Sequence, residues 1–305
     1  MKVVISARNF IFDGCGAVDL LRENGFEAEL AGDGDYYEAI KDADAVINAF
    51  EPMDGALLKK CDKLKLISVR GVGYDYIDAA ACADLGIAIS RTVGTVGDAV
   101  SELAMAYMLH FAREVAAQNE NMQSGRWSRL MTEGLSGKTL GIIGFGEIGQ
   151  ALAKRADAFN MNILYNCKTP KNSGGYSFAP LDELYARSDY IVLALPLTGD
   201  TRGMIDGNAL SKMKNTAVLI NVARAGITDE KALKEAVESG KIRGAAVDVY
   251  ESEPCTDSPL RGVKNIVLTP HTAPFTRKNF IDMNTLAAEN IINFFSGTID
   301  KKYLV

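Results

Sequence analysis

Short apolar runs alternate with helical patterns along the 305-residue chain, in two successive blocks. The runs are continuously apolar, which is typical of parallel strands that helices cover on both faces. The pattern therefore predicts a doubly wound α/β fold, and the length favours two domains. The expected strands are Lys2–Ser6, Ala45–Ala49, Leu64–Val69 and Ile87–Ser90 in the first block, and Thr139–Ile143, Asn162–Tyr165, Tyr190–Leu195, Ala217–Asn221, Gly244–Asp248 and Asn265–Leu268 in the second.

Two long helices are expected besides shorter ones at Val18–Asn24 and Met53–Lys60. The first, about Asp98–Met122, separates the two blocks and takes Asp98 as its N-cap. Its apolar residues run nearly all the way round, so we expect it to be buried on every side, between domains or in a subunit interface. The second, about Lys278–Phe295, lies near the end of the chain.

Composition excludes several classes of protein. The formal charge is −6, which disfavours a protein that holds nucleic acid through its phosphates. The five cysteines are scattered without a CxxC pair, which argues against a disulfide framework and against a zinc site built on cysteine. They stand at Cys15, Cys61, Cys82, Cys167 and Cys255.

The two ends of the chain and its hydropathy bear on location. No apolar run approaches the roughly 18 residues of a membrane span. The first residues predict a strand rather than a signal peptide, and little sequence follows the last helix, so we expect no appended regulatory domain. These features favour a soluble, cytoplasmic protein with no membrane partner and no metal.

A GxGxxG motif stands between an expected strand and an expected helix. In that setting Gly144 makes a tight turn, Gly146 lets the backbone approach a pyrophosphate, and Gly149 lets helix and strand pack closely. The pyrophosphate would lie on the helix N-terminus, at Glu147 and Ile148. A glycine-rich turn that binds nothing is the alternative, which the βαβ context disfavours.

The end of the next strand carries no acidic residue. Asn166, Cys167 and Lys168 stand where a carboxylate would accept hydrogen bonds from an adenosine ribose, and Lys171 follows. Lysines attract a 2′-phosphate that a carboxylate would repel, so this loop favours NADP over NAD. Alternatively, the lysines are solvated loop charges and the selectivity is weak.

Three segments follow later strands and should meet at the carboxyl edge of the sheet. They place Arg224, Glu253 and His271 beside the glycine loop. A cation, a carboxylate and an imidazole suit a reaction that polarises and protonates a carbonyl group. The chain has only two histidines, and the other, His110, lies in the apolar helix, where an interior or interface role is expected.

Taken in order, these motifs resemble the NAD(P)-dependent D-isomer-specific 2-hydroxyacid dehydrogenases. The resemblance covers essentially the whole chain and rests on Gly71–Asp78, Gly144–Gly149, Pro196–Thr198, Asn221–Gly226, Asp248–Pro254 and Pro270-His271. It implies a Rossmann cofactor domain at 96–275 and a flavodoxin-like substrate-binding domain at 1–95 plus 276–305, with the active site between them. It also implies a homodimer, for which the Asp98–Met122 helix is the expected contact.

The resemblance further implies an Arg–Glu–His triad. Arg224 would bind the substrate carboxylate or polarise the 2-oxo group, His271 would protonate the carbonyl oxygen, and Glu253 would orient the imidazole and stabilise its cation. The backbone N–H groups of Val72 and Gly73 would bind the substrate carboxylate. Pro196 and Asp248 would contact the cofactor, Asp248 at the nicotinamide.

The expected substrate is a small anionic 2-oxo acid, which NADPH reduces to the D-2-hydroxy acid; NAD use and the reverse reaction stay open. Phe50 and Glu51 disfavour a phosphorylated substrate, whereas glyoxylate, hydroxypyruvate and branched or aromatic 2-oxo acids stay open. Arg70 precedes the substrate loop and either approaches an anion or forms a structural salt bridge. The alternatives are a nicotinamide-nucleotide-sensing interaction protein on the same fold and, with less support, a formate-type dehydrogenase, whose chemistry needs no protonating Glu253–His271 pair.

Overall fold

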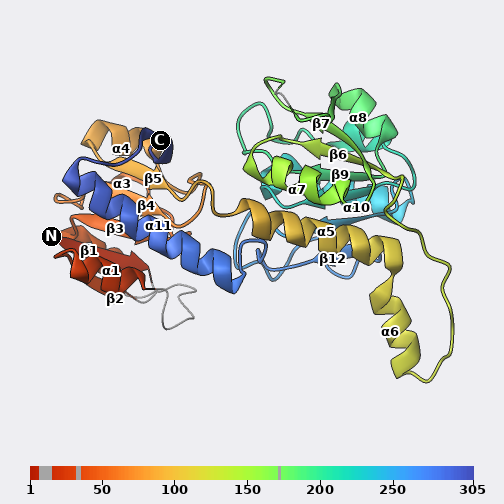
Figure 1. Cartoon of the computed structure of the whole chain (residues 1–305), viewed down its shortest axis with the longest axis horizontal. Coiled ribbons are helices and arrows are strands. Elements are labelled where there is room, and N and C mark those ends of the chain that lie inside the picture. Colours follow the sequence, from red (N-terminus) through yellow and green to blue (C-terminus); the bar gives the residue numbers. More distant parts are fainter. Residues whose placement is uncertain (7–15, 32–35, 171–172) are drawn as a thin grey trace. The chain divides into compact units, whose positions relative to one another are not determined.

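The structure is a computed structural model that describes residues 1–6, 16–31, 36–170 and 173–305. Cys15 and Lys171 lie outside these residues. The chain divides into two compact units, Met1–Val96 with Phe275–Val305, and Gly97–Pro274. Each contains its own parallel sheet with helices on both faces, so the predicted fold class is confirmed (Figure 1).

The first unit contains a five-stranded parallel sheet in the order β2-β1-β3-β4-β5. Its strands are β1 (Lys2–Ser6), β2 (Glu27–Ala31), β3 (Ala45–Asn48), β4 (Leu66–Val69) and β5 (Ala88–Arg91). Its helices are α1 (Ala17–Glu23), α2 (Tyr36–Ala39), α3 (Gly55–Leu58), α4 (Ala79–Leu85) and α11 (Arg277–Ser296), with 3-10 turns η1 (Ile40–Asp42) and η3 (Lys301–Tyr303).

Alternate residues of the central strands enter two separate cores of this unit. Val3 and Ile5 of β1 pack with α1 and α11 on one face, whereas Val4 packs with Tyr36 and other residues on the opposite face. Burial on both faces explains why the strand sequences are continuously apolar. Strand β2 is an edge strand whose sequence mixes Glu with Ala, and for that reason it was not predicted.

The second unit contains a seven-stranded parallel sheet in the order β12-β11-β10-β9-β6-β7-β8. Its strands are β6 (Thr139–Ile143), β7 (Asn162–Asn166), β8 (Ser177–Phe178), β9 (Tyr190–Leu193), β10 (Val218–Asn221), β11 (Gly244–Val247) and β12 (Ile266–Leu268). Its helices are α5 (Gly97–Arg113), α6 (Val115–Gln123), α7 (Glu147–Asp157), α8 (Leu181–Arg187), α9 (Gly207–Ser211) and α10 (Glu230–Glu238), with a 3-10 turn η2 (Ala225–Ile227).

The two faces of this sheet are covered by different helices. Helices α5 and α7 pack together on one face, where Ile142 meets α7. Helices α8, α9 and α10 cover the other face, with Ile143 in their core. Strand order reverses between β9 and β6, which places the loop after β6 at a switch point, where open α/β sheets bind ligands.

The prediction of one helix over Asp98–Met122 was wrong. The helix breaks at Glu114, whose φ of 45° lies in the left-handed region. Arg243 holds the break, because its Nη2 donates to the Phe111 carbonyl at 2.7 Å and pairs with Glu114 Oε1 at 2.8 Å. No glycine or proline marks this position, so the sequence carried no stop signal.

Two other expectations about this segment were also wrong. Helix α5 begins at Gly97, so Asp98 lies in its first turn and is not the N-cap. Burial on every side does not occur, because Asp98, Glu102 and Ala106 form an exposed stripe along α5, and α6 has no buried residue. Figure 1 shows α6 projecting from the end of α5 away from the sheet of this unit.

Among the described helices, none combines the length and apolar character needed to cross a membrane.

Candidate active site

The loops that carry the predicted residues of the second unit leave the carboxyl ends of its parallel strands. The glycine loop follows β6, Arg224 follows β10, Asp248 and Glu253 follow β11, and His271 follows β12. In a parallel sheet these ends share one edge, so the topology gathers the loops there.

The glycine loop has the geometry that a dinucleotide-binding turn requires. Gly144 has a φ of 97°, and a Cβ atom there would lie 2.2 Å from the Ala194 carbonyl oxygen. A Cβ atom at Gly149 would lie 2.2 Å from the Gly144 carbonyl oxygen, so α7 approaches the loop more closely than a side chain allows. Gly146 is exposed, and nothing lies within 4 Å of its hypothetical Cβ. The loop is therefore closely packed at Gly144 and Gly149 and open at Gly146, which fits a pyrophosphate at the N-terminus of α7.

The side chain of Glu147, the first residue of α7, binds the start of helix α5. Its Oε1 accepts a hydrogen bond of 2.7 Å from the Gly97 N–H at the start of α5. A bound cofactor would therefore meet the backbone at Glu147 and at Ile148, both at the positive end of the helix dipole.

The loop after β7 presents few anchored side chains. Asn166 donates to the Ala179 carbonyl at 2.8 Å, so its amide is engaged in structure. Cys167 is partly exposed, with its Sγ 3.1 Å from the Thr169 carbonyl oxygen, and Lys168 is exposed. A thiol and an ammonium group thus stand at the end of this strand, with no carboxylate in Asn166–Pro170.

The imidazole of His271 contacts the carboxylate of Glu253. Its Nδ1 lies 2.8 Å from Oε2 and 3.0 Å from Oε1, and the Tyr250 N–H also donates to Oε1 at 3.0 Å. Burial disfavours the charged carboxylate, but the hydrogen bond and charge of His271, the Tyr250 N–H and the charge of Arg224 together lower the pKa of Glu253. Because Nδ1 faces Glu253, proton exchange with a substrate would involve Nε2, the second ring nitrogen.

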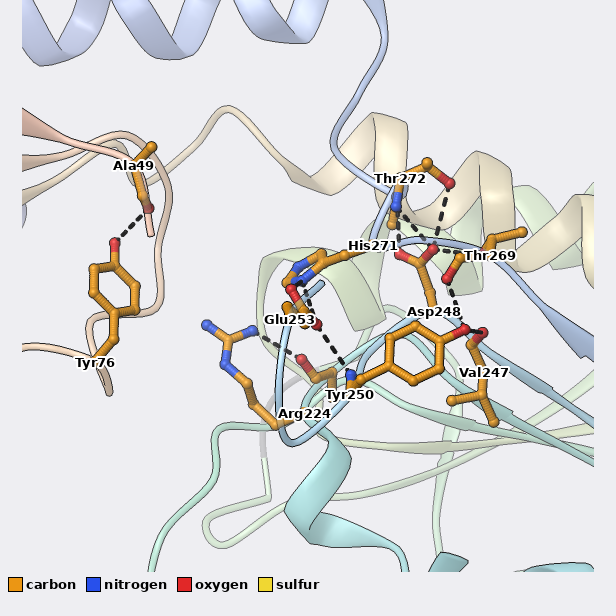
Figure 2. Close-up of polar contacts among 12 residues, drawn as sticks. Ala49, Tyr76, Arg224, Val247, Asp248, Tyr250, Glu253, Thr269, His271 and Thr272 are labelled. Atoms are coloured by element: carbon orange, nitrogen blue, oxygen red, sulfur yellow. Dashed lines mark hydrogen bonds and ion pairs between the residues drawn. The ribbon is translucent and has the colours of Figure 1, made fainter. Parts of the chain in front are cut away.

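Arg224 lies beside this pair (Figure 2). Its Nη1 donates to the Ala223 carbonyl at 2.8 Å, and its own carbonyl accepts from the Asn221 side chain at 2.9 Å. Asn221, at the end of β10, is buried and thereby fixes the backbone from which the guanidinium extends. The structure brings Arg224, Glu253 and His271 together, which yields a cation and a polarised imidazole at one place.

Asp248 is fully buried, and its carboxylate serves the loop that carries His271. Oδ1 accepts from the Thr272 N–H at 2.8 Å and from the Thr269 hydroxyl, and Oδ2 accepts from the Ala273 N–H at 2.9 Å. Its hydrogen bonds are thus directed at the protein, and a contact with nicotinamide stays a prediction.

Pro196 is exposed in the loop after β9, and its carbonyl accepts from the Thr201 hydroxyl.

Comparison with known proteins identifies the family. The model of the D-isomer specific 2-hydroxyacid dehydrogenase NAD binding domain matches residues 105–273. A glyoxylate reductase of Pyrococcus furiosus is 38% identical over 276 residues, which cover 86% of this chain and 82% of that protein. This chain belongs to the D-isomer specific 2-hydroxyacid dehydrogenase family. It is therefore an oxidoreductase with a domain for a nicotinamide cofactor.

Two solved structures of similar proteins hold different cofactors. An acyclic imino acid reductase in complex with NADPH and D-Arg has a TM-score of 0.90, is 27% identical and covers 100% of each chain. A formate dehydrogenase from Staphylococcus aureus in complex with NAD has a TM-score of 0.89, is 28% identical and covers 100% of this chain and 98% of that one. Family membership thus does not decide between NADP and NAD.

The first unit of this dehydrogenase carries the predicted substrate loop at the carboxyl end of β4. Within the described part of the chain, the N–H groups of Val72 and Gly73 donate no hydrogen bond to the protein. Arg70 is 4% exposed, and its guanidinium lies 5.0 Å from the centre of the Phe280 ring.

Glu51 also differs from its expected role. Its side chain is buried, accepts from the Ser6 hydroxyl and from the N–H groups of Ala49 and Phe50, and thus holds the loop after β3 from inside. Phe50 is partly exposed beside Tyr76, whose hydroxyl donates to the Ala49 carbonyl at 2.8 Å. The aromatic ring, and not the carboxylate, therefore forms the surface of this loop.

Three polar residues near the catalytic loop of this dehydrogenase were missed. Tyr107 on α5 shares a short hydrogen bond with the Thr269 hydroxyl, and Tyr250 donates to the Thr269 carbonyl at 3.0 Å. Tyr107 looked like one more apolar position of a helix, and its hydroxyl gave no signal in the sequence. His110, by contrast, is a partly buried residue packed edge-on against Phe111, well within the expectation of a structural histidine.

Proposed function

We propose that this protein reduces a small 2-oxo acid to the D-2-hydroxy acid with NADPH. The observation that carries the proposal is the Glu253–His271 pair beside Arg224, at the sheet edge where the open glycine loop also lies. An imidazole held by a carboxylate at Nδ1 can deliver a proton from Nε2 to a carbonyl oxygen. The glyoxylate reductase activity named for the Pyrococcus relative supports the reaction class.

Each residue of the site has a distinct task in this reaction. When bound, the reduced nicotinamide supplies the hydride that forms the new C–H bond at the 2-oxo carbon. The His271 imidazolium gives its Nε2 proton to the carbonyl oxygen, whose π-bond electrons form the new O–H bond, and the ring is left neutral. Glu253 stabilises the imidazolium before transfer, and Arg224 binds the substrate carboxylate or polarises the carbonyl group.

The preference for NADPH rests on the end of β7. An adenosine ribose there would meet Cys167 and Lys168, with no carboxylate in Asn166–Pro170 to bind a 2′-hydroxyl or to repel a phosphate. The exposed Lys168 can reach a 2′-phosphate as a mobile cation, and Lys171 adds positive charge to the sequence. The NADPH complex of the imino acid reductase is compatible with this assignment.

The substrate that fits best is small and carries a single carboxylate. The N–H groups of Val72 and Gly73, which donate to no acceptor within the described residues, suit a carboxylate. Phe50 offers an aromatic surface where a phosphate would need cations, so glyoxylate or an apolar 2-oxo acid is favoured over a phosphorylated one.

We infer that the projecting segment contacts a second copy of this chain and that the protein is a homodimer. Trp127 and Met131, which follow α6, are 78% and 99% exposed, and Val115 and Met122 of α6 are also exposed. Large apolar side chains gathered on one projecting segment mark a protein interface. The contact assigned here is α6 and residues 124–131, rather than the buried part of α5.

The test is oxidation of NADPH, followed by absorbance, against a panel of 2-oxo acids, with chiral analysis of the product. Turnover with a D-2-hydroxy acid product supports the proposal. No turnover on any 2-oxo acid, together with a cofactor-dependent change of oligomeric state, would instead support a nucleotide-sensing protein. Formate oxidation with NAD in the same assay would favour the formate-type dehydrogenase.

A further inference from the structure

His271 occupies a backbone conformation that its neighbours must impose. Its φ is 52°, in the left-handed region that a residue with a Cβ atom seldom adopts. It follows β12, which is a three-residue strand at the edge of the sheet and pairs only with β11 among the described strands. Such a conformation persists only where the surroundings fix it, so the groups that hold residues 269–273 determine where the imidazole points.

The buried carboxylate of Asp248 holds this loop on both sides of His271. On one side it accepts from the Thr269 hydroxyl, and on the other from the N–H groups of Thr272 and Ala273, at 2.8 and 2.9 Å. The Thr272 hydroxyl adds a longer contact of 3.3 Å to Oδ1. Two backbone donors and two hydroxyl groups therefore converge on one side chain that is 0% exposed.

Thr269 joins this carboxylate to α5. A carboxylate only accepts hydrogen bonds, so the Thr269 hydroxyl proton is directed at Asp248. The hydroxyl oxygen then accepts from Tyr107, which is 4% exposed and whose pKa is raised by burial, so that its proton is retained. The hydrogen bonds are thus donated from Tyr107 to Thr269 and from Thr269 to Asp248. Tyr250 also donates a hydrogen bond to the Thr269 carbonyl at 3.0 Å.

We propose that Tyr107 and Thr269 are positioning residues for His271. They act through Asp248 and the 269–273 loop, and neither needs to touch substrate or cofactor. The proposal rests on the assignment of His271 as the proton donor. It predicts that loss of either hydroxyl lets the imidazole leave the orientation that Glu253 and the loop define.

The experiment compares three test variants of the untagged protein with the wild type. Tyr107→Phe and Thr269→Val each remove one hydroxyl with little change of volume, and Thr269→Ser keeps the hydroxyl. Because the chain has two histidines, NMR spectra of histidine-labelled protein contain two imidazole signals, and His110→Gln assigns them. This signal reports the position of His271 whether or not the protein turns over a substrate.

We expect the His271 signal to shift or broaden in Tyr107→Phe and Thr269→Val. The reduction kcat should fall on the order of tenfold, the change that loss of one such hydrogen bond produces, with little change of KM or of NADPH affinity. Thr269→Ser should restore both readouts. Matched controls are Tyr185→Phe, another buried tyrosine of this unit, and Thr139→Val, at the amino end of the interior strand β6.

The outcomes separate the two assignments. Wild-type signals and wild-type kcat in both Tyr107→Phe and Thr269→Val would overturn the positioning role. A shifted His271 signal in a protein that reduces no 2-oxo acid would leave the positioning role standing and contradict the proposed function. If Thr269→Val does not fold, Tyr107→Phe decides, since its ring stays in the core.

Discussion

Nδ1 of His271 lies 2.8 Å from Oε2 of Glu253, whose side chain is 32% exposed. The pair is therefore accessible to solvent and yet fixed by a charge-assisted hydrogen bond. It links the loops after β11 and β12, so a proton donor and its orienting carboxylate come from neighbouring strands of one sheet. Substitutions at these two positions should have different consequences.

Replacement of His271 by Ala should abolish reduction of the best 2-oxo acid. General acid catalysis contributes about 10² to 10⁴ in rate, so kcat should fall by at least about two orders of magnitude. NADPH affinity, measured by fluorescence titration, should stay near the wild-type value. A variant that retains most of the wild-type rate would exclude His271 as the acid.

Replacement of Glu253 by Gln should change the pH dependence of stability. In the unfolded chain the pKa of Glu253 should be near the ordinary glutamate value of about 4.3. In the folded protein it is lower. Its ionised form therefore stabilises the fold above that value, and the contribution is lost as pH falls through the folded pKa.

Chemical denaturation should check this sign. The wild type should exceed Glu253→Gln in free energy of unfolding at neutral pH, and the difference should shrink as the pH falls below about 4. A stability difference that is constant from pH 7 to acid would contradict the assignment.

Replacement of Cys167 by Asp together with Lys168 by Ala should shift the cofactor preference toward NADH. The new carboxylate can accept hydrogen bonds from a ribose diol and repels a 2′-phosphate. The ratio of kcat/KM for NADPH to that for NADH is the measurement, and Asn215→Asp, exposed before the amino end of β10, serves as a control for an added charge elsewhere. An unchanged ratio would mean that the 2′-phosphate lies somewhere else.

Two glycines of the same loop should respond differently to Ala. A methyl group at Gly149 would collide with the Gly144 carbonyl oxygen, so Gly149→Ala should lower Tm as well as cofactor affinity. At Gly146, φ is −81° and the space is open, so Gly146→Ala should fold normally and lose NADPH affinity alone. Equal effects of both variants on Tm would contradict this division.

Charged substitutions on the projecting segment should dissociate the homodimer. Trp127→Glu with Met131→Glu places two carboxylates where apolar surface would be buried, and sedimentation should then give the mass of one chain, 32.9 kDa. Phe178→Glu, at another exposed aromatic of the same unit, should leave the mass unchanged. A wild type that already sediments as a monomer would refute the dimer.

The sequence predicted the parts of the site that depend on backbone pattern and rare residue types. Continuous apolar runs located the central strands, such as β6 and β9. Because the chain has only two histidines, and only His271 follows a strand, the candidate proton donor was also predicted. What it could not predict were contacts between distant side chains. The Arg243–Glu114 pair that ends α5 and the Tyr107 hydroxyl both depend on residues more than 100 positions apart in the chain, for which local pattern carries no information.

The hydrogen bond from the Gly97 N–H to Glu147 has a consequence for redesign. The first residue of α7 is adjacent to the cofactor loop, and a library that varies this loop would naturally include it. Its side chain, however, satisfies the start of α5, so every substitution there exposes a helix terminus and loosens a second element. Libraries aimed at cofactor choice should therefore keep Glu147 constant and place their diversity after β7, where Cys167 and Lys168 contact no distant element among the described residues.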